Sequence, residues 1–185
     1  MATGKRKTLR GKLLVAHPTL LDPNFLQSIV YVVEHDAHGA VGIVLNRPTN
    51  ACASELIAKG EPRYSFYDSV PLLLGGPVGQ ERVALVLYER YGRCGKIRVT
   101  FGLPPAELAL KANQKSARVY AYYGHAGWGA GQLDSEVRDG SWLIRPADAA
   151  ILNYRVVEGM WPFLINGDQQ WRVLLDYLPR ESRNN

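Results

Sequence analysis

Cysteine is scarce in this chain of 185 residues, which contains only Cys52 and Cys94. The two residues match neither a zinc-ligand spacing nor a Cys-x-x-Cys redox motif. Isolated thiols in a chain of this length are typical of a reducing compartment, and we therefore expect a cytoplasmic protein.

Long apolar runs are also missing. None approaches the ~18 residues of a membrane span, and the run 13–16 is too short for a signal peptide, so no membrane is expected among the partners.

The sequence also lacks the common motifs of nucleophilic, phosphate and metal chemistry. It has no Gly-x-Ser-x-Gly elbow and no P-loop with Gly-Lys-Ser or Gly-Lys-Thr. His35 and His38 are three residues apart, which places them on opposite faces of an extended strand, and no third ligand lies nearby in the sequence. Cys94 stands among cations that could activate its thiol, although an idle cysteine is the simpler interpretation. We predict no catalytic residue, no metal and no cofactor, which favours a non-enzymatic protein.

A glycine-rich stretch, residues 124–143, holds five glycines and two of the four tryptophans. A strand, a glycine loop and a helix in this order are the context of a dinucleotide site. However, Gln132 and Asp134 occupy positions where the G-x-G-x-x-G pattern requires glycine. Asp134 and Glu136 would also lie in the first turns of the helix and repel a phosphate. We interpret the glycines as a tight turn that packs under Trp128 and begins a short helix.

Acidic residues are absent from the first twelve positions, where five basic residues stand: Lys5, Arg6, Lys7, Arg10 and Lys12. The rest of the chain carries 17 basic and 17 acidic residues, so the net charge of +5 belongs to the N-terminal end. We expect residues 1–10 to form a flexible basic tail and residues 11–185 to form one domain. The tail could contact nucleic acid or an anionic surface, or it could be only a solvated terminus.

A second basic region lies between residues 82 and 118. Eight basic residues stand there against two acidic ones: Arg82, Arg90, Arg93, Lys96, Arg98, Lys111, Lys115 and Arg118 against Glu89 and Glu107. This net charge of +6 indicates a basic face that could bind a protein partner or a nucleic acid. No helix-turn-helix, zinc finger or RNA-binding signature accompanies it. Proximity in the sequence does not establish that these side chains share a surface.

The pattern of apolar residues predicts many strands and few helices. Strands are expected over 13–16, 29–34, 40–45, 82–88, 96–101, 118–123 and 141–144, while 71–74 is an apolar run that leads into Gly75. Helices are expected over 53–59, 104–113, part of 129–139, 148–152 and from Pro162 onward, while 170–178 could be either. Because the strands are clustered and the helices are short and scattered, the expected fold class is α+β.

Three blocks of the sequence resemble the YqgE/AlgH family. They run from Gly11-Lys12-Leu13-Leu14-Val15-Ala16-His17-Pro18 to Gly42-Ile43-Val44-Leu45-Asn46-Arg47-Pro48, over Leu74-Gly75-Gly76-Pro77-Val78, and over 124–143 with Arg145-Pro146-Ala147-Asp148. The resemblance implies an α+β fold with a small closed or bifurcated, mainly antiparallel β-sheet core and short peripheral helices. It implies no known catalytic residue, metal or cofactor. One family name derives from a proposed role in alginate regulation, which implies a transcriptional regulator by association alone.

Three hypotheses about function remain open. The first is a non-enzymatic cytoplasmic binding or regulatory protein, whose partner would be a protein or a nucleic acid held by the basic tail and residues 82–118. The alternative is a small-molecule binding protein or weak enzyme, because loops rich in Gly, Asn and Arg could meet at one end of the sheet. Its pocket would be lined by six residues: His35, Asn46, Arg47, Gly75, Gly76 and Trp128. A purely structural role in an assembly is a third, weaker hypothesis.

Overall fold

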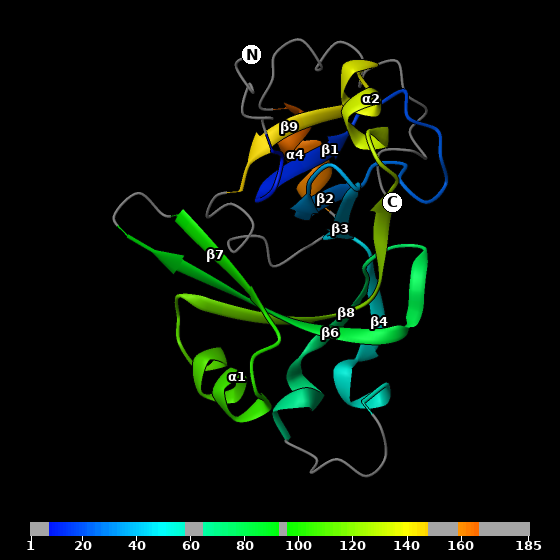
Figure 1. The fold of residues 1–185 in the computed structure, drawn as a ribbon. Coiled ribbons are helices and arrows are strands. Elements are labelled where there is room, and N and C mark those ends of the chain that lie inside the picture. The colour runs from blue at the N-terminus through cyan, green and yellow to red at the C-terminus, as the bar shows by residue number, and fades with distance from the viewer. Residues whose placement is uncertain (1–7, 58–64, 93–95, 148–158, 167–185) are drawn as a thin grey trace.

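The computed structural model describes residues 8–57, 65–92, 96–147 and 159–166 (Figure 1). The strands are β1 (Lys12–Ala16), β2 (Ile29–His35), β3 (Ala40–Val44), β4 (Pro48–Cys52), β5 (Pro71–Leu74), β6 (Val78–Tyr91), β7 (Lys96–Phe101), β8 (Ala117–Trp128) and β9 (Trp142–Pro146). The helices are α1 (Pro105–Ala112), α2 (Gln132–Arg138) and α4 (Met160–Asn166), with short 3-10 turns at Ala53–Glu55 and Ser65–Ser69.

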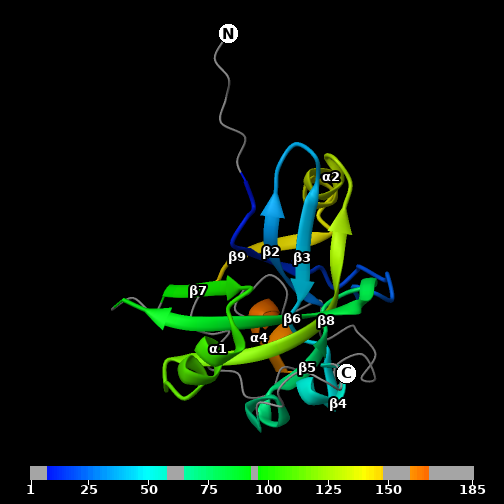
Figure 2. The same ribbon diagram turned by 60° about the horizontal axis from the view of Figure 1, so that its bottom comes forward.

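Strand β8 is shared by two halves of one branched sheet. Residues 117–123 of β8 pair with β6 and β5, and residues 126–128 pair with β3. The first half therefore has the order β9-β1-β2-β3, and the second half consists of β4, β5, β8, β6 and β7. Figures 1 and 2 show the two halves lying across one another. Every pairing is antiparallel except that of β5 with β8.

The α+β class is confirmed, and the sheet takes the bifurcated form rather than the closed one. The physical reason is the length of β8. Its twelve residues are enough to pair with strands of both halves. The two halves are therefore joined through β8, and neither half has to close on itself as a barrel. The division between a tail at residues 1–10 and a domain at 11–185 stays a prediction. Within the described part of that tail, Leu9 is buried and its N–H donates to Nδ1 of His35.

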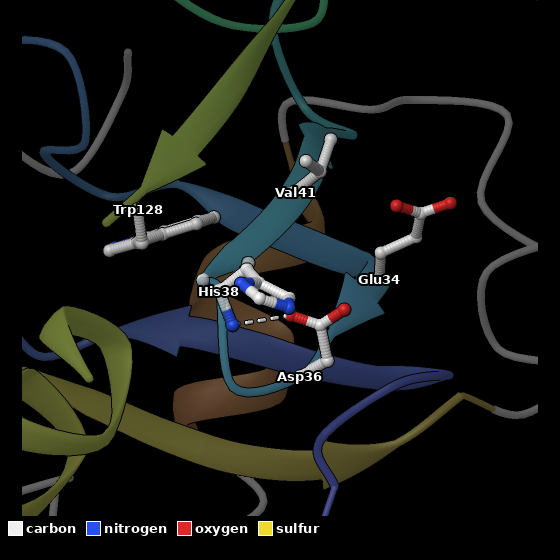
Figure 3. Close-up of a pocket in the computed structure, with 7 residues that line it drawn as sticks. Glu34, Asp36, His38, Val41 and Trp128 are labelled. Carbon is white, nitrogen blue, oxygen red and sulfur yellow. Dashed lines mark hydrogen bonds between the residues drawn. The ribbon is translucent and has the colours of Figure 1, made fainter. Parts of the chain in front are cut away.

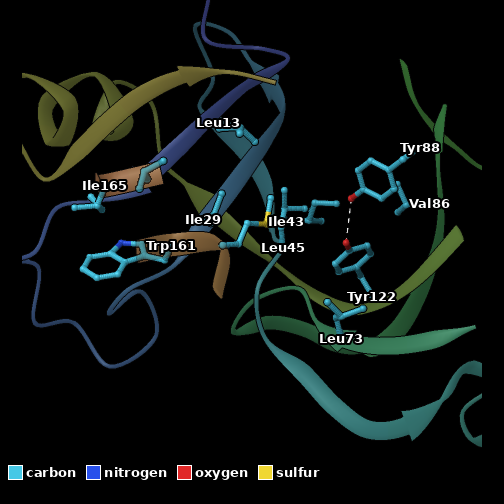
Figure 4. Packing of buried hydrophobic residues seen from close by; sticks show 12 residues of the cluster. Leu13, Ile29, Ile43, Leu45, Leu73, Val86, Tyr88, Tyr122, Trp161 and Ile165 are labelled. Carbon is cyan, nitrogen blue, oxygen red and sulfur yellow. Dashed lines mark hydrogen bonds between the residues drawn. The ribbon is translucent and has the colours of Figure 1, made fainter. Parts of the chain in front are cut away.

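Hydrophobic side chains form three clusters around the branched sheet. The largest lies between the two halves and joins strands β1, β2 and β3 to β6, β8 and α4 (Figure 4). Trp161 on α4 reinforces this joint because its indole N–H donates to the carbonyl of Ala16 at 2.9 Å. The second cluster lies between the first half, α2 and the β1–β2 loop, and the third lies under α1.

Several sequence-based boundaries differ from the structure. The expected helix 53–59 is only a 3-10 turn in its described part, and the segment before it forms the short strand β4. The two strands expected at 82–88 and 118–123 are both longer, because they pair with each other along most of their length. Helix α4 begins two residues before Pro162, since a proline in the first turn removes an N–H that has no helical partner. The predictions for 148–152 and 170–178 lie outside the described residues.

The interpretation of residues 124–128 as a glycine turn was wrong, because these residues complete β8. The glycines serve instead to let two chain segments cross. A Cβ atom at Gly76 would lie 2.2 Å from the backbone of His125, and one at Gly124 would lie 2.3 Å from the carbonyl oxygen of Gly76. Contacts this short exclude any side chain, so glycine is required on both segments. The short helix expected after this stretch is α2.

Candidate functional site

Asn46 and Arg47, predicted to line a pocket, hold the end of the β1–β2 loop. The Asn46 side chain accepts the N–H of Ile29 and donates to the carbonyl of Gln27, both at 2.8 Å. The Arg47 guanidinium donates to the carbonyl of Leu26, and burial lowers the pKa of this arginine. Gln27 needs such support because its φ of 54° lies in the left-handed region, which is strained for a side chain of this kind.

Gly75 lies beside the end of β3, next to Arg47. The N–H of Leu74 donates to the carbonyl of Arg47 at 2.9 Å, and the carbonyl of Gly75 accepts from Val44 at 2.8 Å. The N–H of Gly75 donates to Tyr123 at 2.7 Å, so it is not free to form an anion-binding nest. The structure therefore brings Asn46, Arg47 and Gly75 together, with Gly76 next in the chain.

His35 and Trp128 lie at the opposite end of β3. Both flank Ala40, which pairs with His35 on β2 and with Trp128 on β8. Val44, the neighbour of Gly75, is four residues further along, a distance of roughly 13 Å in a strand. The six predicted pocket residues are thus divided between two ends of one strand. Whether either group binds a ligand stays a prediction.

His35 is engaged by two neighbouring segments. Its Nδ1 accepts the N–H of Leu9 at 3.0 Å, and its Nε2 lies 3.4 Å from Oδ1 of Asp134 on α2. An accepting Nδ1 places the proton of the neutral ring on Nε2, where it points at the carboxylate. The side chain is 4% exposed. This histidine therefore ties the N-terminal segment and α2 to β2.

Glu136 is half-buried and accepts hydrogen bonds from two buried tryptophans, a role that the sequence did not reveal. One of its carboxylate oxygens accepts the indole N–H of Trp128 at 2.9 Å and that of Trp142 at 2.8 Å. Gln132 donates to the other oxygen at 2.8 Å, and Phe25 stacks on Trp128 with ring centroids 6.0 Å apart. The sequence suggested only that this carboxylate would repel phosphate. Glu136 lies eight residues after Trp128 and six residues before Trp142. This spacing matches no recognisable motif.

A small cavity lies at the β2–β3 hairpin and is bordered by Trp128 (Figure 3). It has a volume of about 200 Å³ and is lined by Glu34, Asp36, His38, Gly39, Ala40, Val41 and Trp128. The N–H of His38 donates to Asp36 at 2.7 Å and shapes the hairpin turn. Drug-sized ligands occupy roughly 300–1,000 Å³. This cavity therefore has room for a single functional group and not for a whole ligand of that size. Of the six predicted pocket residues, Trp128 alone borders it.

Metal ligation finds no support in the described part of the chain. Across residues 8–57, 65–92, 96–147 and 159–166, no three His, Cys, Asp or Glu side chains are grouped to hold a metal ion. No helix in these same ranges is long and apolar enough to cross a membrane.

Basic residues that are scattered in the sequence gather at one end of β6, β7 and β8. We call this region the basic end, and it consists of Arg90, Lys96, Arg98, Lys115 and Arg118. Arg118 lies opposite Tyr88, and Arg98 lies opposite Glu89. Arg90 donates its N–H to Ser116, next to Lys115. The strand register thus places cations from three strands at this end, with Lys96 and Arg98 on the face that carries α1 and Arg90 and Arg118 on the other face.

Few acidic groups offset these charges. The carboxylate of Glu89 already binds Lys111 of α1 at 2.8 Å. None of the five residues of the basic end forms an ion pair with another described residue. Arg98 instead covers the ring of Tyr91, with its guanidinium 5.1 Å from the ring centroid. Among the residues that the structure describes, the basic end therefore carries positive charge that no ion pair neutralises.

A branched, mainly antiparallel sheet with a shared central strand and short peripheral helices places the protein in the α+β class. A family model described as AlgH-like matches residues 13–167. The chain belongs to this family, and the resemblance inferred from its three sequence blocks is confirmed.

Similar proteins come from diverse bacteria. A UPF0301 protein of Stutzerimonas stutzeri is 34% identical over 152 residues, which cover 78% of this chain and 80% of that protein. A UPF0301 protein of Thioalkalivibrio sulfidiphilus is 33% identical over 171 residues and covers 88% and 86%. The solution structure of the AlgH protein from Pseudomonas aeruginosa superposes with a TM-score of 0.66 at 28% identity, over 97% of this chain and 98% of that one. A crystal structure from Corynebacterium diphtheriae, at 21% identity and a TM-score of 0.67 over 97% and 92%, shares the fold.

Proposed function

We propose that the protein is a non-enzymatic, cytoplasmic binding protein with a regulatory role, and that it binds an anionic macromolecule through its basic end. The observation that carries this proposal is that five cations, none of them in an ion pair with another described residue, lie at one end of β6, β7 and β8. An anionic chain bound there would release counterions from both surfaces. The cytoplasmic location rests on cysteine usage, and the regulatory role rests on the family resemblance alone.

A non-enzymatic role is supported by the bonds of the polar residues that the sequence had suggested for a pocket. Asn46 and Arg47 are occupied by backbone groups of the β1–β2 loop. His35 is occupied by Leu9 and Asp134. A general acid or base must reach a substrate atom within hydrogen-bond distance. Side chains that hold the fold with these same atoms are poorly placed for such work.

Binding to anionic probes tests the proposal. Fluorescence anisotropy would be measured with a labelled single-stranded oligonucleotide and with labelled polyglutamate, each at low and at high salt. We expect binding of at least one probe that weakens steeply with salt. Removal of two charges in the variant Lys96→Gln/Arg98→Gln should raise the Kd about fivefold to tenfold, because exposed ion contacts contribute up to about 1 kcal/mol each.

A matched control removes two charges elsewhere. Arg82 is highly exposed beside Glu81, and Arg138 ends α2, so neither belongs to the basic end. The variant Arg82→Gln/Arg138→Gln should therefore bind the probes like the unmodified protein. Equal weakening in both double variants would show that only net charge matters. A lack of binding of both probes at low salt would overturn the proposal.

The cavity at the β2–β3 hairpin favours a second candidate function, the binding of a small molecule. Glu34 and Asp36 at its rim would suit a cationic group, and Trp128 would contribute an apolar wall. Titration with small ammonium and guanidinium compounds should then shift the indole resonance of Trp128, and the shift should be lost in Glu34→Gln/Asp36→Asn. An unmoved indole signal would exclude these ligand classes from the cavity. Binding at the predicted group around Asn46 and Gly76 remains a separate prediction.

A further inference from the structure

Strand β7 has one open edge among the described residues. Within residues 8–57, 65–92, 96–147 and 159–166 it pairs only with β6, in a register that sets Lys96 opposite Tyr91 and Thr100 opposite Leu87. Figures 1 and 2 both show β7 at the outer margin of the second half of the sheet. An open edge presents a row of backbone groups that another extended chain can join.

Hydrogen bonds of β6 determine which of these groups point outward. Arg90 donates its N–H to the carbonyl of Ser116, so Arg90 and every second residue before it are bonded to β8. In an antiparallel ladder the residues between them are bonded to the strand on the other side. Glu89 and Leu87 are therefore bonded to β7.

The partners of Glu89 and Leu87 on β7 are Arg98 and Thr100, whose backbone groups consequently point inward to β6. The N–H and C=O groups of Ile97, Val99 and Phe101 point outward. None of these three residues has a backbone partner on that side among the residues that the structure describes. The edge offers three donors and three acceptors at strand spacing.

Side chains of β7 are sorted by charge between its two faces. Lys96 and Arg98 are exposed on the face that carries α1. Ile97, Val99 and Phe101 are half-buried on the other face and pack against the core between the sheet halves. Side chains directly opposite each other on paired strands share a face. An added strand would therefore meet two cations on one face and three apolar side chains on the other.

The same features disfavour two other occupants. If β7 paired with β7 of a second copy, Lys96 and Arg98 of both copies would be crowded on neighbouring strands, and like charges there are destabilising. For a nucleic acid, base stacking would require an open aromatic face. Tyr91 is the exposed aromatic residue at the basic end, and Arg98 already covers its ring.

We propose that the open edge of β7 binds an extended peptide segment as an additional strand, and that this segment alternates acidic and apolar residues. Its backbone bonds to Ile97, Val99 and Phe101, its acidic side chains lie opposite Lys96 and Arg98, and its apolar side chains extend the core face. This inference rests on the proposed function, since it names the anionic macromolecule that the basic end receives. Strand addition supplies the affinity, and the alternation selects the partner.

A pair of peptide probes tests strand addition on the unmodified protein. The first is a twelve-residue peptide that alternates glutamate and valine. The second has the same sequence with alternate backbone nitrogens methylated, so that it keeps its charge but cannot donate to the edge. We expect the methylated peptide to bind about tenfold or more weakly, since several hydrogen bonds are lost at about a few-fold each. Amide resonances of Ile97, Val99 and Phe101 should shift with the first peptide only.

A protein variant provides the reciprocal test. Val99→Pro removes an outward N–H, which an edge strand tolerates because no ladder bond to β6 is lost. It should weaken the first peptide about as much as methylation does, whereas Val99→Thr, which keeps the N–H and the branched shape, should bind normally. The two peptides are also compared on the unmodified protein, and that comparison does not depend on the stability of the Val99→Pro variant.

The outcomes separate this inference from the proposed function. Equal binding of both peptides would mean attraction by charge alone, which overturns strand addition and leaves the anionic partner in place. Binding of the oligonucleotide but of neither peptide would also overturn it. A dimer in light scattering that Val99→Pro dissociates would show that the edge joins two copies. Failure of every anionic probe would overturn both proposals.

Discussion

Glu136 illustrates how one side chain can organise a cluster. Trp128 and Trp142 are 6% and 3% exposed, and both indole N–H groups need an acceptor inside the protein. A single carboxylate oxygen serves both, while Gln132 binds its second oxygen. A charged acceptor makes shorter and stronger bonds than a neutral one. We infer that this carboxylate fixes α2 against the first half of the sheet.

Replacement of Glu136 by alanine should destabilise the protein by about 2–4 kcal/mol, because two nearly buried indole groups would lose their acceptor. Urea unfolding followed by tryptophan fluorescence would measure the change in the free energy of unfolding. Glu81→Ala is the matched control. Glu81 forms only an exposed pair with Arg82, so its loss should change stability by less than about 0.5 kcal/mol. Similar stability of the two variants would contradict the role assigned to Glu136.

At the scale of elements, the crossing of the β5–β6 connection over β8 determines the branched sheet. Gly75 bonds to both Val44 on β3 and Tyr123 on β8, so this connection joins the two halves at the point where β8 leaves one for the other. The crossing works only because Gly76 and Gly124 present no side chains. The two glycines are therefore determinants of topology.

Two glycine substitutions separate close packing from backbone strain. Gly76→Ala would place a Cβ atom 2.2 Å from backbone atoms that cannot move independently, and it should cost more than about 3 kcal/mol or prevent folding. Gly92 also has a positive φ, of 68°, but a Cβ atom there would meet no atom within 4 Å. Gly92→Ala should therefore cost only about 1 kcal/mol. Thermal unfolding of both variants would test this, and comparable melting temperatures would refute the crossing argument.

At the scale of the whole molecule, the core between the two halves contains buried tyrosine hydroxyl groups. The hydroxyl of Tyr88 on β6 donates to that of Tyr122 on β8 at 3.1 Å, and both residues are at most 2% exposed (Figure 4). Burial raises the pKa of each phenol well above its usual value of 10.0. Burial therefore favours the neutral forms of both phenols in the folded protein.

Alkaline pH should consequently weaken the whole fold. Above about pH 10 these tyrosines lose protons in the unfolded chain but keep them in the folded one, so the unfolded state binds fewer protons and stability falls as pH rises. Each contributes a slope of about 1.4 kcal/mol per pH unit there, and none at neutral pH. Urea unfolding at several pH values would measure the slope. In Tyr88→Phe/Tyr122→Phe it should become shallower, and an unchanged slope would reject this origin.

Sequence patterns predicted much of the local structure and little of the candidate site. The strand at 96–101 was predicted with its observed bounds because alternating apolar and basic residues mark a half-buried strand without reference to anything distant. Asn46 and Arg47 were predicted to line a pocket, but their partners on the β1–β2 loop were not predicted. Those partners are about twenty residues away in the chain, and no local pattern encodes such a separation.

The sequence by itself determined the α+β class, the membership of the AlgH-like family and the excess of positive charge between residues 82 and 118. These properties depend on composition, local periodicity and motif order. Only the tertiary structure decided that β8 crosses between two halves, that the six predicted pocket residues lie at two ends of β3, and that five cations share one end of the sheet. The physical reason is strand register, which is set by which side chains are buried together across the whole molecule.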